Sequence, residues 1–286
     1  MSERPHDGCL VAGYVSHNFK KHLRDLTPIN QYLAATLSDK GIDKTEVKLS
    51  NSLESMRVLL GRGEVDWVTA QVFGASILVD AGVAEVLAQR WKKGRENYRS
   101  LLFVRADSGI GSMAELRGRV VAFEDPSSTT GWFIPASTLV SKGLELNQLQ
   151  SPRSSARPDL VNFVFAREEI NISTWVFKGL AQAGALSDGD WTNPKRVPTQ
   201  FRKQLKILHK SVPYPRSLIL VRKSLDPRMK EILKSALLTA HDDRSAEQAL
   251  RAFHRTSKFT PVNDTVIRAL ERARALRRTV LPDVSP

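Results

Sequence analysis

Cysteine is almost absent from this sequence, because Cys9 is the single example among 286 residues. An internal disulfide is therefore excluded, and the neighbouring Leu10 and Val11 predict that Cys9 is a small buried residue. Long hydrophobic runs are absent as well, since none approaches the roughly 20 apolar residues of a membrane span. The first residues hold no apolar segment of the kind that a signal peptide needs, so they predict no export signal.

The motifs of common enzyme classes are also missing. The sequence contains no Walker loop, no Gly-x-Ser-x-Gly elbow and no dinucleotide-binding fingerprint. Its six histidines share no metal-like spacing, and none lies between His22 and His209. His17 and His22 flank the loop after the first expected strand, where a solvated loop histidine is the more ordinary interpretation. We therefore predict no catalytic residue, no metal site and no cofactor.

Acidic residues are fewer than basic ones, 30 against 43, which gives a formal net charge of +13. Such a charge permits nonspecific attraction to nucleic acids or to anionic membranes. The basic residues are spread along the chain, however, and the densest stretch, 268–278, is interleaved with apolar residues at helical spacing. This pattern predicts one amphipathic helix with a solvated basic face, and no specific nucleic-acid partner is expected.

Short apolar runs alternate with amphipathic stretches along most of the chain. Strands are expected at 10–15, 47–49, 65–68, 101–104, 120–123, 161–164 and 183–186, and helices at 27–37, 52–60, 74–81 and up to 139. In the first helix, Thr27 is the expected cap and Pro28 the first helical residue. Strand-then-helix alternation predicts an α/β fold with mostly parallel sheets.

Two stretches, 98–105 and 213–223, are predicted to pass between two lobes. Each ends in an arginine that is followed by a turn. Two such crossings insert one lobe between the halves of the other. We expect lobe one to comprise residues 1–103 and 217–286 and lobe two to comprise residues 104–216, with a ligand cleft between them.

The most informative stretch is 120–131, which reads Val-Val-Ala-Phe-Glu-Asp-Pro-Ser-Ser-Thr-Thr-Gly. Its apolar residues predict a buried strand, Pro126 marks a turn, and a run of hydroxyl residues opens a helix. A helix start carries unpaired backbone N–H groups and the positive end of the dipole, so it attracts anions. The alternative is an ordinary Ser/Thr cap with spare polar residues. The hydroxyl residues are Ser127, Ser128, Thr129 and Thr130.

This loop resembles the strand-Asp-Pro-x-Ser-Thr-Ser-Gly loop of the phosphate-, phosphite- and phosphonate-binding proteins of ABC transporters. The resemblance extends to Gly-Glu-Val-Asp at 63–66 and to 98–109, which is similar to a Tyr-x-Ser-x-x-x-x-(Arg/Lys)-x-Asp-Ser pattern. Segment 178–187 is similar to a Gly-x-x-Asp-Ala-Gly-Ala strand, and 210–225 to the return crossing. The resemblance implies an α/β, two-lobed type II periplasmic-binding-protein-like fold with a ligand cleft between the lobes.

The resemblance also implies which residues bind the ligand. In the family the hydroxyl and N–H groups of the loop hold the phosphoryl oxygens. Tyr98 matches an aromatic residue that lines the cleft, and Asp188 follows the Ala-Gly-Ala strand, where relatives carry acidic or amide residues. A packed ring for Tyr98 and a solvated turn acid for Asp188 are the alternatives. The loop residues implied as ligands are Ser127, Ser128, Thr129 and Thr130.

Two positions depart from the family pattern. Gln71 stands where relatives have a glycine close to the ligand, so its amide either enters the cleft or the cleft is partly filled. Leu53 stands near a cleft-facing tyrosine of the phosphonate binders and cannot donate a hydrogen bond. We therefore expect a small or apolar-tailed phosphorus oxyanion to be preferred over an aminoalkylphosphonate, whose amine would lose its water without gaining a partner.

The function implied by the resemblance is that of a monomeric solute-binding protein and not of an enzyme. Such a protein captures a small phosphorus oxyanion (phosphonate, phosphite or phosphate) by hinge closure and delivers it to an ABC permease. Its location would be periplasmic, as in the family. Two alternatives stay open: a cytoplasmic ligand-sensing or regulatory protein on the same fold, and an enzyme built on that fold.

Overall fold

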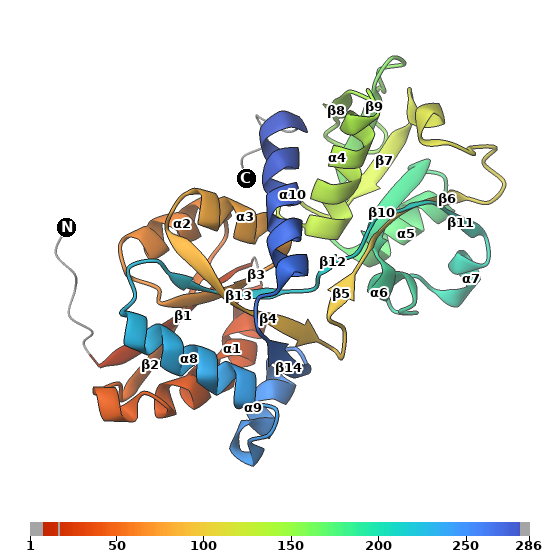
Figure 1. Cartoon of the computed structure of the whole chain (residues 1–286). Coiled ribbons are helices and arrows are strands. Elements are labelled where there is room, and N and C mark those ends of the chain that lie inside the picture. The colour runs from red at the N-terminus through yellow and green to blue at the C-terminus, as the bar shows by residue number, and fades with distance from the viewer. Residues whose placement is uncertain (1–7, 17, 281–286) are drawn as a thin grey trace. The chain divides into compact units, whose positions relative to one another are not determined.

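The computed structural model describes residues 8–16 and 18–280 (Figure 1). The chain divides into two compact units, which are described separately below. Of the described residues, the first unit comprises those up to Asn97 together with Pro215–Arg274, and the second comprises Tyr98–Tyr214 together with residues 275–280. None of the described helices is both long enough and apolar enough to cross a membrane.

A six-stranded mixed sheet forms the centre of the first unit. The strand order is β14 (Thr256–Thr260), β4 (Ala84–Lys92), β13 (Leu218–Arg222), β3 (Trp67–Ala70), β1 (Cys9–Val15) and β2 (Lys44–Ser50). β1 pairs in parallel with both β2 and β3, whereas β13 and β4 are joined to their neighbours by antiparallel pairing. Because β13 is antiparallel to both β3 and β4, the carboxyl ends of β1, β3 and β4 lie at one edge of the sheet.

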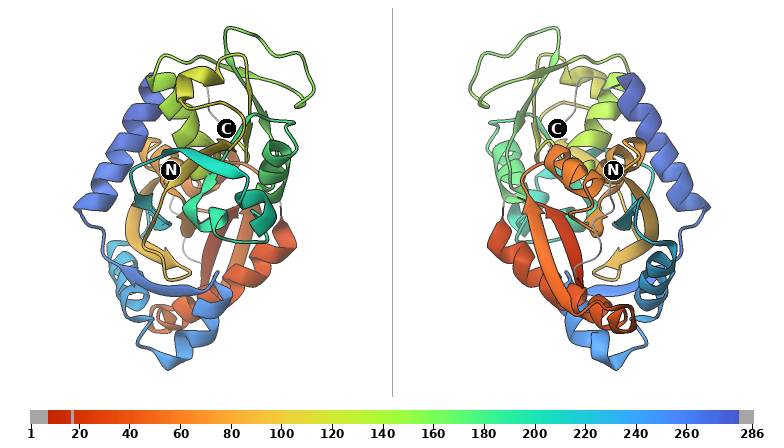
Figure 2. Two further views of the ribbon diagram at one scale, coloured as in Figure 1. Left: turned by 90° about the vertical axis from the view of Figure 1, so that its right-hand side faces the viewer. Right: turned by 90° about the vertical axis from the view of Figure 1, so that its left-hand side faces the viewer.

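Helices cover both faces of this sheet. One face packs against α1 (Phe19–Ala35), α8 (Pro227–Thr239) and α9 (Glu247–Ala252), which share a single apolar core with it. Figure 2 shows α1 running along β1 and β2. On the other face, Gly13 lies against Met56 of α2 (Leu53–Gly61), and α2 packs on α3 (Val72–Asp80). The last helix, α10 (Asp264–Val280), is joined to α3 by an ion pair between Arg274 and Asp80.

The first helix begins earlier than the sequence predicts. The expected start at Thr27 with Pro28 at the first position is wrong, because α1 starts after Asn18 and contains Pro28 in its interior. An interior proline removes one hydrogen bond and costs about 3 kcal/mol. Burial of the apolar side chains on both sides of Pro28, among them Leu26 and Ile29, offsets this cost.

The longer α1 also changes the interpretation of the nearby histidines. His22 is buried on α1, and its ring stacks on Tyr14 at a centroid distance of 4.3 Å. The expected solvated loop histidine is therefore wrong for His22, whereas His17 lies outside the described residues. Cys9 is partly buried, and burial raises the pKa of its thiol.

The second unit is also built on a six-stranded mixed sheet. The strand order is β11 (Leu205–Lys210), β6 (Ser100–Arg105), β10 (Ala183–Ser187), β7 (Val120–Phe123), β9 (Val161–Phe165) and β8 (Leu146–Gln148). β10, β7, β9 and β8 run parallel, while β6 is antiparallel to both of its neighbours. Its α-helices are α4 (Ile134–Ser141), α5 (Glu169–Phe177), α6 (Asp188–Trp191) and α7 (Thr199–Arg202).

Short strands occupy the two places where the chain changes units. β5 (Asn97–Tyr98) pairs with β12 (Tyr214–Pro215), at the two stretches that the sequence marks as crossings. β6 belongs as a whole to the sheet of the second unit. The α/β class is confirmed, but the prediction of mostly parallel sheets is wrong, because five of the ten strand pairs described in the two six-stranded sheets are antiparallel.

Candidate functional site

The hydroxyl run follows β7 directly, as the sequence predicts. Ser127 is exposed, and both its N–H and its hydroxyl donate to Asp125 Oδ1. Ser128 is the cap of a π-helical turn, Thr129–Phe133, that leads into α4, and its hydroxyl oxygen accepts from the N–H of Gly131 at 3.0 Å. Single π-helical turns occur frequently at functional sites.

Glycine is required at position 131. A Cβ added there would lie 2.6 Å from Glu124 Cβ and 2.6 Å from Glu124 Oε2, well inside van der Waals contact. The backbone of this residue also accepts a hydrogen bond from the N–H of Glu124 at 3.0 Å. The close approach of Gly131 and Glu124 therefore fixes how the loop folds back on the end of β7.

The loop hydroxyls differ in what they can offer a ligand. The hydroxyl of Ser128 donates a hydrogen bond to Glu124 Oε2 at 2.6 Å. Because a serine has a single O–H, this hydroxyl has no second hydrogen bond to donate to a ligand. Thr129 and Thr130 are buried, and the carbonyl oxygen of Thr130 accepts from the hydroxyl of Ser100 at 2.7 Å. Ser128 therefore has a structural role in holding the loop to Glu124.

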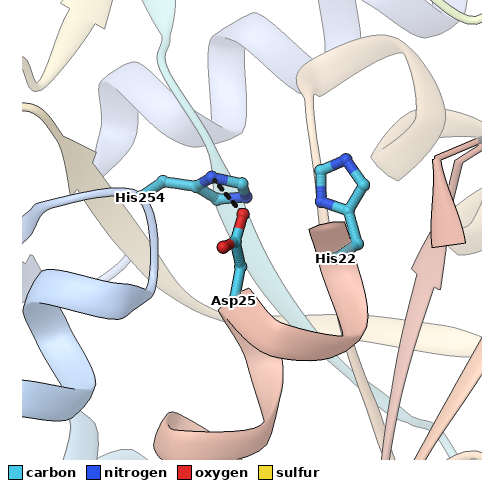
Figure 3. A group of neighbouring side chains, drawn as sticks. All are labelled: His22, Asp25 and His254. Atoms are coloured by element: carbon cyan, nitrogen blue, oxygen red, sulfur yellow. Dashed lines mark ion pairs between the residues drawn. The ribbon is translucent and has the colours of Figure 1, made fainter. Parts of the chain in front are cut away.

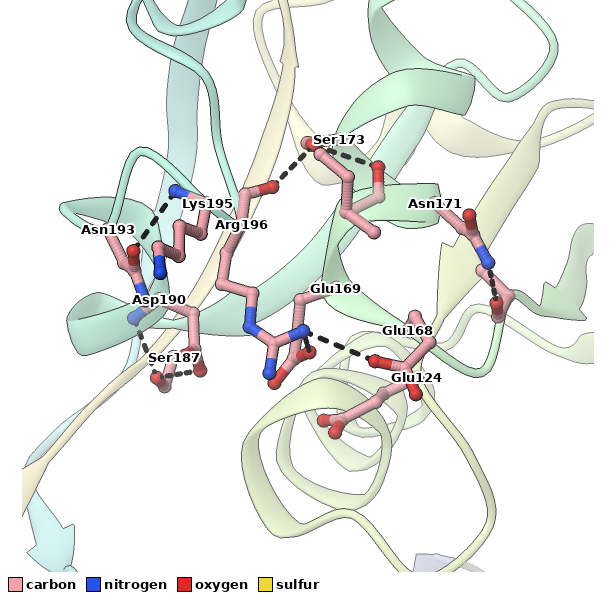
Figure 4. A network of polar contacts seen from close by, with 12 residues as sticks. Glu124, Glu168, Glu169, Asn171, Ser173, Ser187, Asp190, Asn193, Lys195 and Arg196 are labelled. Atoms are coloured by element: carbon pink, nitrogen blue, oxygen red, sulfur yellow. Dashed lines mark hydrogen bonds and ion pairs between the residues drawn. The ribbon is translucent and has the colours of Figure 1, made fainter.

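An acidic cluster lies behind the loop. Arg196 forms ion pairs with Glu168 at 3.2 Å and with Glu169 at 3.0 Å, and Figure 4 shows these side chains together with Glu124 and Asp190. Burial and, to a smaller extent, the negative charge of Glu169 raise the pKa of Glu124 to about 8, against the lowering effect of the Ser128 hydroxyl. Burial and the charge of Asp190 also raise the pKa of Glu169. Glu124 is therefore largely protonated at neutral pH.

Tyr98 and Asp188 lie at the same edge of this sheet as the hydroxyl run. The ring of Tyr98 is buried, and the N–H of the next residue, Arg99, donates to Asp188 Oδ1 at 3.3 Å. The N–H of Asp188 donates back to the carbonyl oxygen of Arg99 at 3.0 Å. Register pairs Ser100 with Ser187, the last residue of β10, so the start of β6 meets the ends of β7 and β10.

All the site residues expected from the sequence lie in the second unit except Gln71. Ser100, which the Tyr-x-Ser pattern contains, is the residue at this edge that the sequence interpretation did not select. Gln71 caps the start of α3 in the first unit, directly after β3. Leu53 is buried, and its Cδ2 would lie 3.0 Å from a Cβ added to Gly74, so its side chain fills the space between α2 and α3.

One cluster of metal-ligand residue types lies in the first unit. His22, Asp25 and His254 each offer one ligand atom, and these atoms lie within 4.8 Å of one another. The sequence spacing gave no indication of this cluster.

Two α/β units on mixed sheets, with a hydroxyl loop at the carboxyl end of a parallel strand, define a substrate-binding protein of the type II periplasmic class. The model of one family, described as ABC transporter, phosphonate, periplasmic substrate-binding protein, matches residues 13–266. The chain therefore belongs to this family, whose members are substrate-binding proteins and not enzymes.

Solved structures share this fold. XAC2383 from Xanthomonas citri, in structures bound to chloride ion and to ATP, is 30% identical to this chain, with a TM-score of 0.92. The match to the ATP-bound structure covers 98% of this chain and 100% of XAC2383. PhnD1 from Prochlorococcus marinus in complex with methylphosphonate is 16% identical, with a TM-score of 0.70 and coverage of 96% and 98%. A phosphonate transporter binding protein from Pseudomonas aeruginosa is also 16% identical, with a TM-score of 0.69 and coverage of 97% and 89%.

Proposed function

We propose that this protein binds a small phosphorus oxyanion, namely a phosphonate, phosphite or phosphate, and delivers it to an ABC transporter permease. The observation that carries the proposal is the gathering of the hydroxyl run, Tyr98 and Asp188 at one edge of the second sheet. Neutral donors at a helix start match a tetrahedral oxyanion without the cost of burying an isolated cation. We propose a monomer that acts in the periplasm, in keeping with the family description.

Each loop residue has its own role in this proposal. Thr129 and Thr130, with the N–H groups at the start of the π-helical turn, bind the phosphoryl oxygens. Ser127 contributes from the exposed end of the loop. Ser128 supports the loop without binding the ligand itself, because its hydroxyl donates its hydrogen bond to Glu124. Asp188 is proposed to contact the rest of the ligand, and Gln71 stays a predicted ligand contact that the sequence resemblance implies.

Replacing Thr129 by alanine is expected to weaken methylphosphonate binding by roughly 1–3 kcal/mol, because a charged acceptor loses its hydrogen-bond donor. Titration calorimetry measures the change. Thr138→Ala is the matched control, since the hydroxyl of Thr138 donates to the carbonyl oxygen of Ile134 within the same helix. Unchanged affinity in both Thr129→Ala and Ser128→Ala would show that the loop is not the binding site.

A second expectation concerns ligand selectivity. Leu53 is buried and apolar, so it offers no hydrogen bond to a polar ligand tail. An amine buried without a partner loses its hydration at a cost of a few kcal/mol. We expect methylphosphonate or phosphite to displace 2-aminoethylphosphonate in a competition titration. Tighter binding of 2-aminoethylphosphonate would contradict this and would indicate that Gln71 or Asp188 accepts from the amine.

A nucleotide is the second candidate ligand, favoured by the structure of XAC2383 bound to ATP at 30% identity. The phosphates of ATP present the same tetrahedral oxygens to a hydroxyl loop. This candidate fits the alternative of a ligand-sensing protein on the same fold. Titration of ATP beside methylphosphonate separates the two, because tight binding of ATP with no binding of methylphosphonate would replace the transport proposal.

A further inference from the structure

Two buried histidine rings in the first unit each have a nitrogen without a hydrogen-bond partner. These atoms are Nδ1 of His22 and Nε2 of His254. The ring centroids lie 5.4 Å apart, and Nδ1 of His254 lies 3.4 Å from Asp25 Oδ2. Figure 3 shows the second ring nitrogen of His254 and one ring nitrogen of His22 facing the space between the rings. The geometry alone would suit either a metal ion or an anion.

Cationic side chains surround this pair of rings. Arg90 is 2% exposed, its Nε donates to Ser217 Oγ at 3.2 Å, and its Cζ lies 4.1 Å from the ring centre of Phe253, the residue before His254. Its Nη1 has no hydrogen-bond partner. Lys92 follows two residues later, so both side chains emerge on the same face of β4. The N–H of Lys93 donates to the carbonyl oxygen of Arg255 at 2.9 Å, which holds this end of β4 against the turn at His254.

Burial, together with these positive charges, lowers the pKa values of both histidines and of Lys92. Burial and the charges of Lys21, Lys92 and Arg90 lower the pKa of His22 to about 4, and burial with Lys92 and Arg90 lowers that of His254 much further. Burial with the charge of Arg216 lowers the pKa of Lys92 as well. Among the residues that the structure describes, no carboxylate forms an ion pair with Arg90 or Lys92.

A metal ion would add positive charge to this surplus of cations, where like charges repel strongly away from bulk water. An anion has the opposite effect, because it supplies the missing acceptor for Arg90 Nη1 and neutralises Lys92. A buried cation without a partner is costly, and its pairing with an oxyanion is among the stronger hydrogen bonds in proteins. The Coulomb balance therefore favours an anion.

We propose that the first unit contains an anion subsite in which Arg90 and Lys92 bind a phosphate-type oxyanion beside the rings of His22 and His254. The planar guanidinium of Arg90 donates from Nη1, and Lys92 contributes a point charge. The negative charge of the bound anion raises the lowered pKa of His254, and the protonated ring then donates Nδ1–H to Asp25 and Nε2–H to the anion. The residues of this subsite belong to the first unit, whereas the hydroxyl loop belongs to the second unit.

The test uses inorganic phosphate as the probe, with the full chain at constant ionic strength. The Thr129→Ala variant serves as the background, so that the remaining binding reports on the first unit. We expect phosphate binding to persist there, and Lys92→Gln in that background to weaken it by about tenfold or more, the usual effect of losing a hydrogen bond to a charged group. Lys20→Gln is the matched control, because Lys20 is exposed on α1 and its loss removes the same charge.

Three outcomes would overturn the subsite. The first is equal phosphate affinity in Lys92→Gln and Lys20→Gln. The second is complete loss of phosphate binding in Thr129→Ala alone, which would leave the proposed function intact and assign all phosphate binding to the loop. The third is stoichiometric, tight Zn²⁺ binding that His22→Ala and His254→Ala abolish, since this would show a cation site. Arg90→Lys provides a second variant that keeps the buried charge but removes the planar donor.

Discussion

Replacement of Asp66 by alanine is expected to lower the free energy of unfolding by about 3–5 kcal/mol, since it leaves a buried cation without its partner. Asp66 Oδ1 accepts from Nε of Arg222 at 2.9 Å, and its Oδ2 accepts from the N–H of Val11 at 2.8 Å. Both charged side chains are at least nine-tenths buried. The carboxylate thus joins β1, the start of β3 and the end of β13.

Urea denaturation followed by circular dichroism measures this loss. Glu54→Ala is the matched control, because Glu54 pairs with Arg57 on the exposed surface of α2 and such pairs contribute about 0–1 kcal/mol. The double variant Asp66→Ala/Arg222→Met is expected to recover part of the stability, since no unpaired charge stays buried. Equal losses in Asp66→Ala and Glu54→Ala would contradict a buried ion pair in this position.

The Glu124→Gln variant is expected to be more stable than the wild type at pH 9 by roughly 1–3 kcal/mol, because it removes a carboxyl that must ionise while buried. The pKa of Glu124 is raised from 4.5 to about 8 in the folded protein. A raised folded-state pKa stabilises the protein below pH 4.5, and this contribution is lost as the pH rises through about 8. The difference between variant and wild type should therefore grow between these two pH values.

Thermal or urea unfolding at pH 5, 7 and 9 provides the comparison. Glu145→Gln is the control in the same unit, because Glu145 is exposed and loses the same charge. Its stability relative to the wild type should change little across this range. A Glu124→Gln advantage that is constant with pH would show that Glu124 is already ionised at pH 5 and that its burial does not govern its protonation.

The sequence predicted the hydroxyl loop and most of the strands because their signals are local. β7 occupies the expected four apolar residues, and α2 begins within one residue of the helix expected at 52–60, with Ser52 as its cap. Hydroxyl caps and apolar runs depend on neighbours within a few residues, so they can be recognised without tertiary information. The hydrogen bond that the Ser128 hydroxyl donates to Glu124 could not be predicted, since it depends on the π-helical turn that brings the two side chains together.

The parts that the sequence missed depend on tertiary packing. β4 was not expected, because Gln89, Arg90 and Lys92 interrupt its apolar pattern, and their burial comes from neighbouring elements. The start of α1 was misplaced because a proline usually stands in the first turn of a helix, whereas Pro28 lies in the interior of α1. His22 and His254 come from α1 and from the turn before β14, so their proximity exists only in the folded sheet.

The position of β13 has a consequence for the order in which the chain can fold. β13 lies between β3 and β4 in the first sheet and pairs with both, yet it follows the whole second unit in the sequence. The ribosome must therefore synthesise the whole second unit before β13 is available to pair with β3 and β4. Until then both strands have an open edge, and open edges pair readily with other chains. The second unit lacks this dependence, since every strand of its sheet is made in one uninterrupted stretch. We expect it to fold first during translation, with the first unit closing only after residue 222 leaves the ribosome.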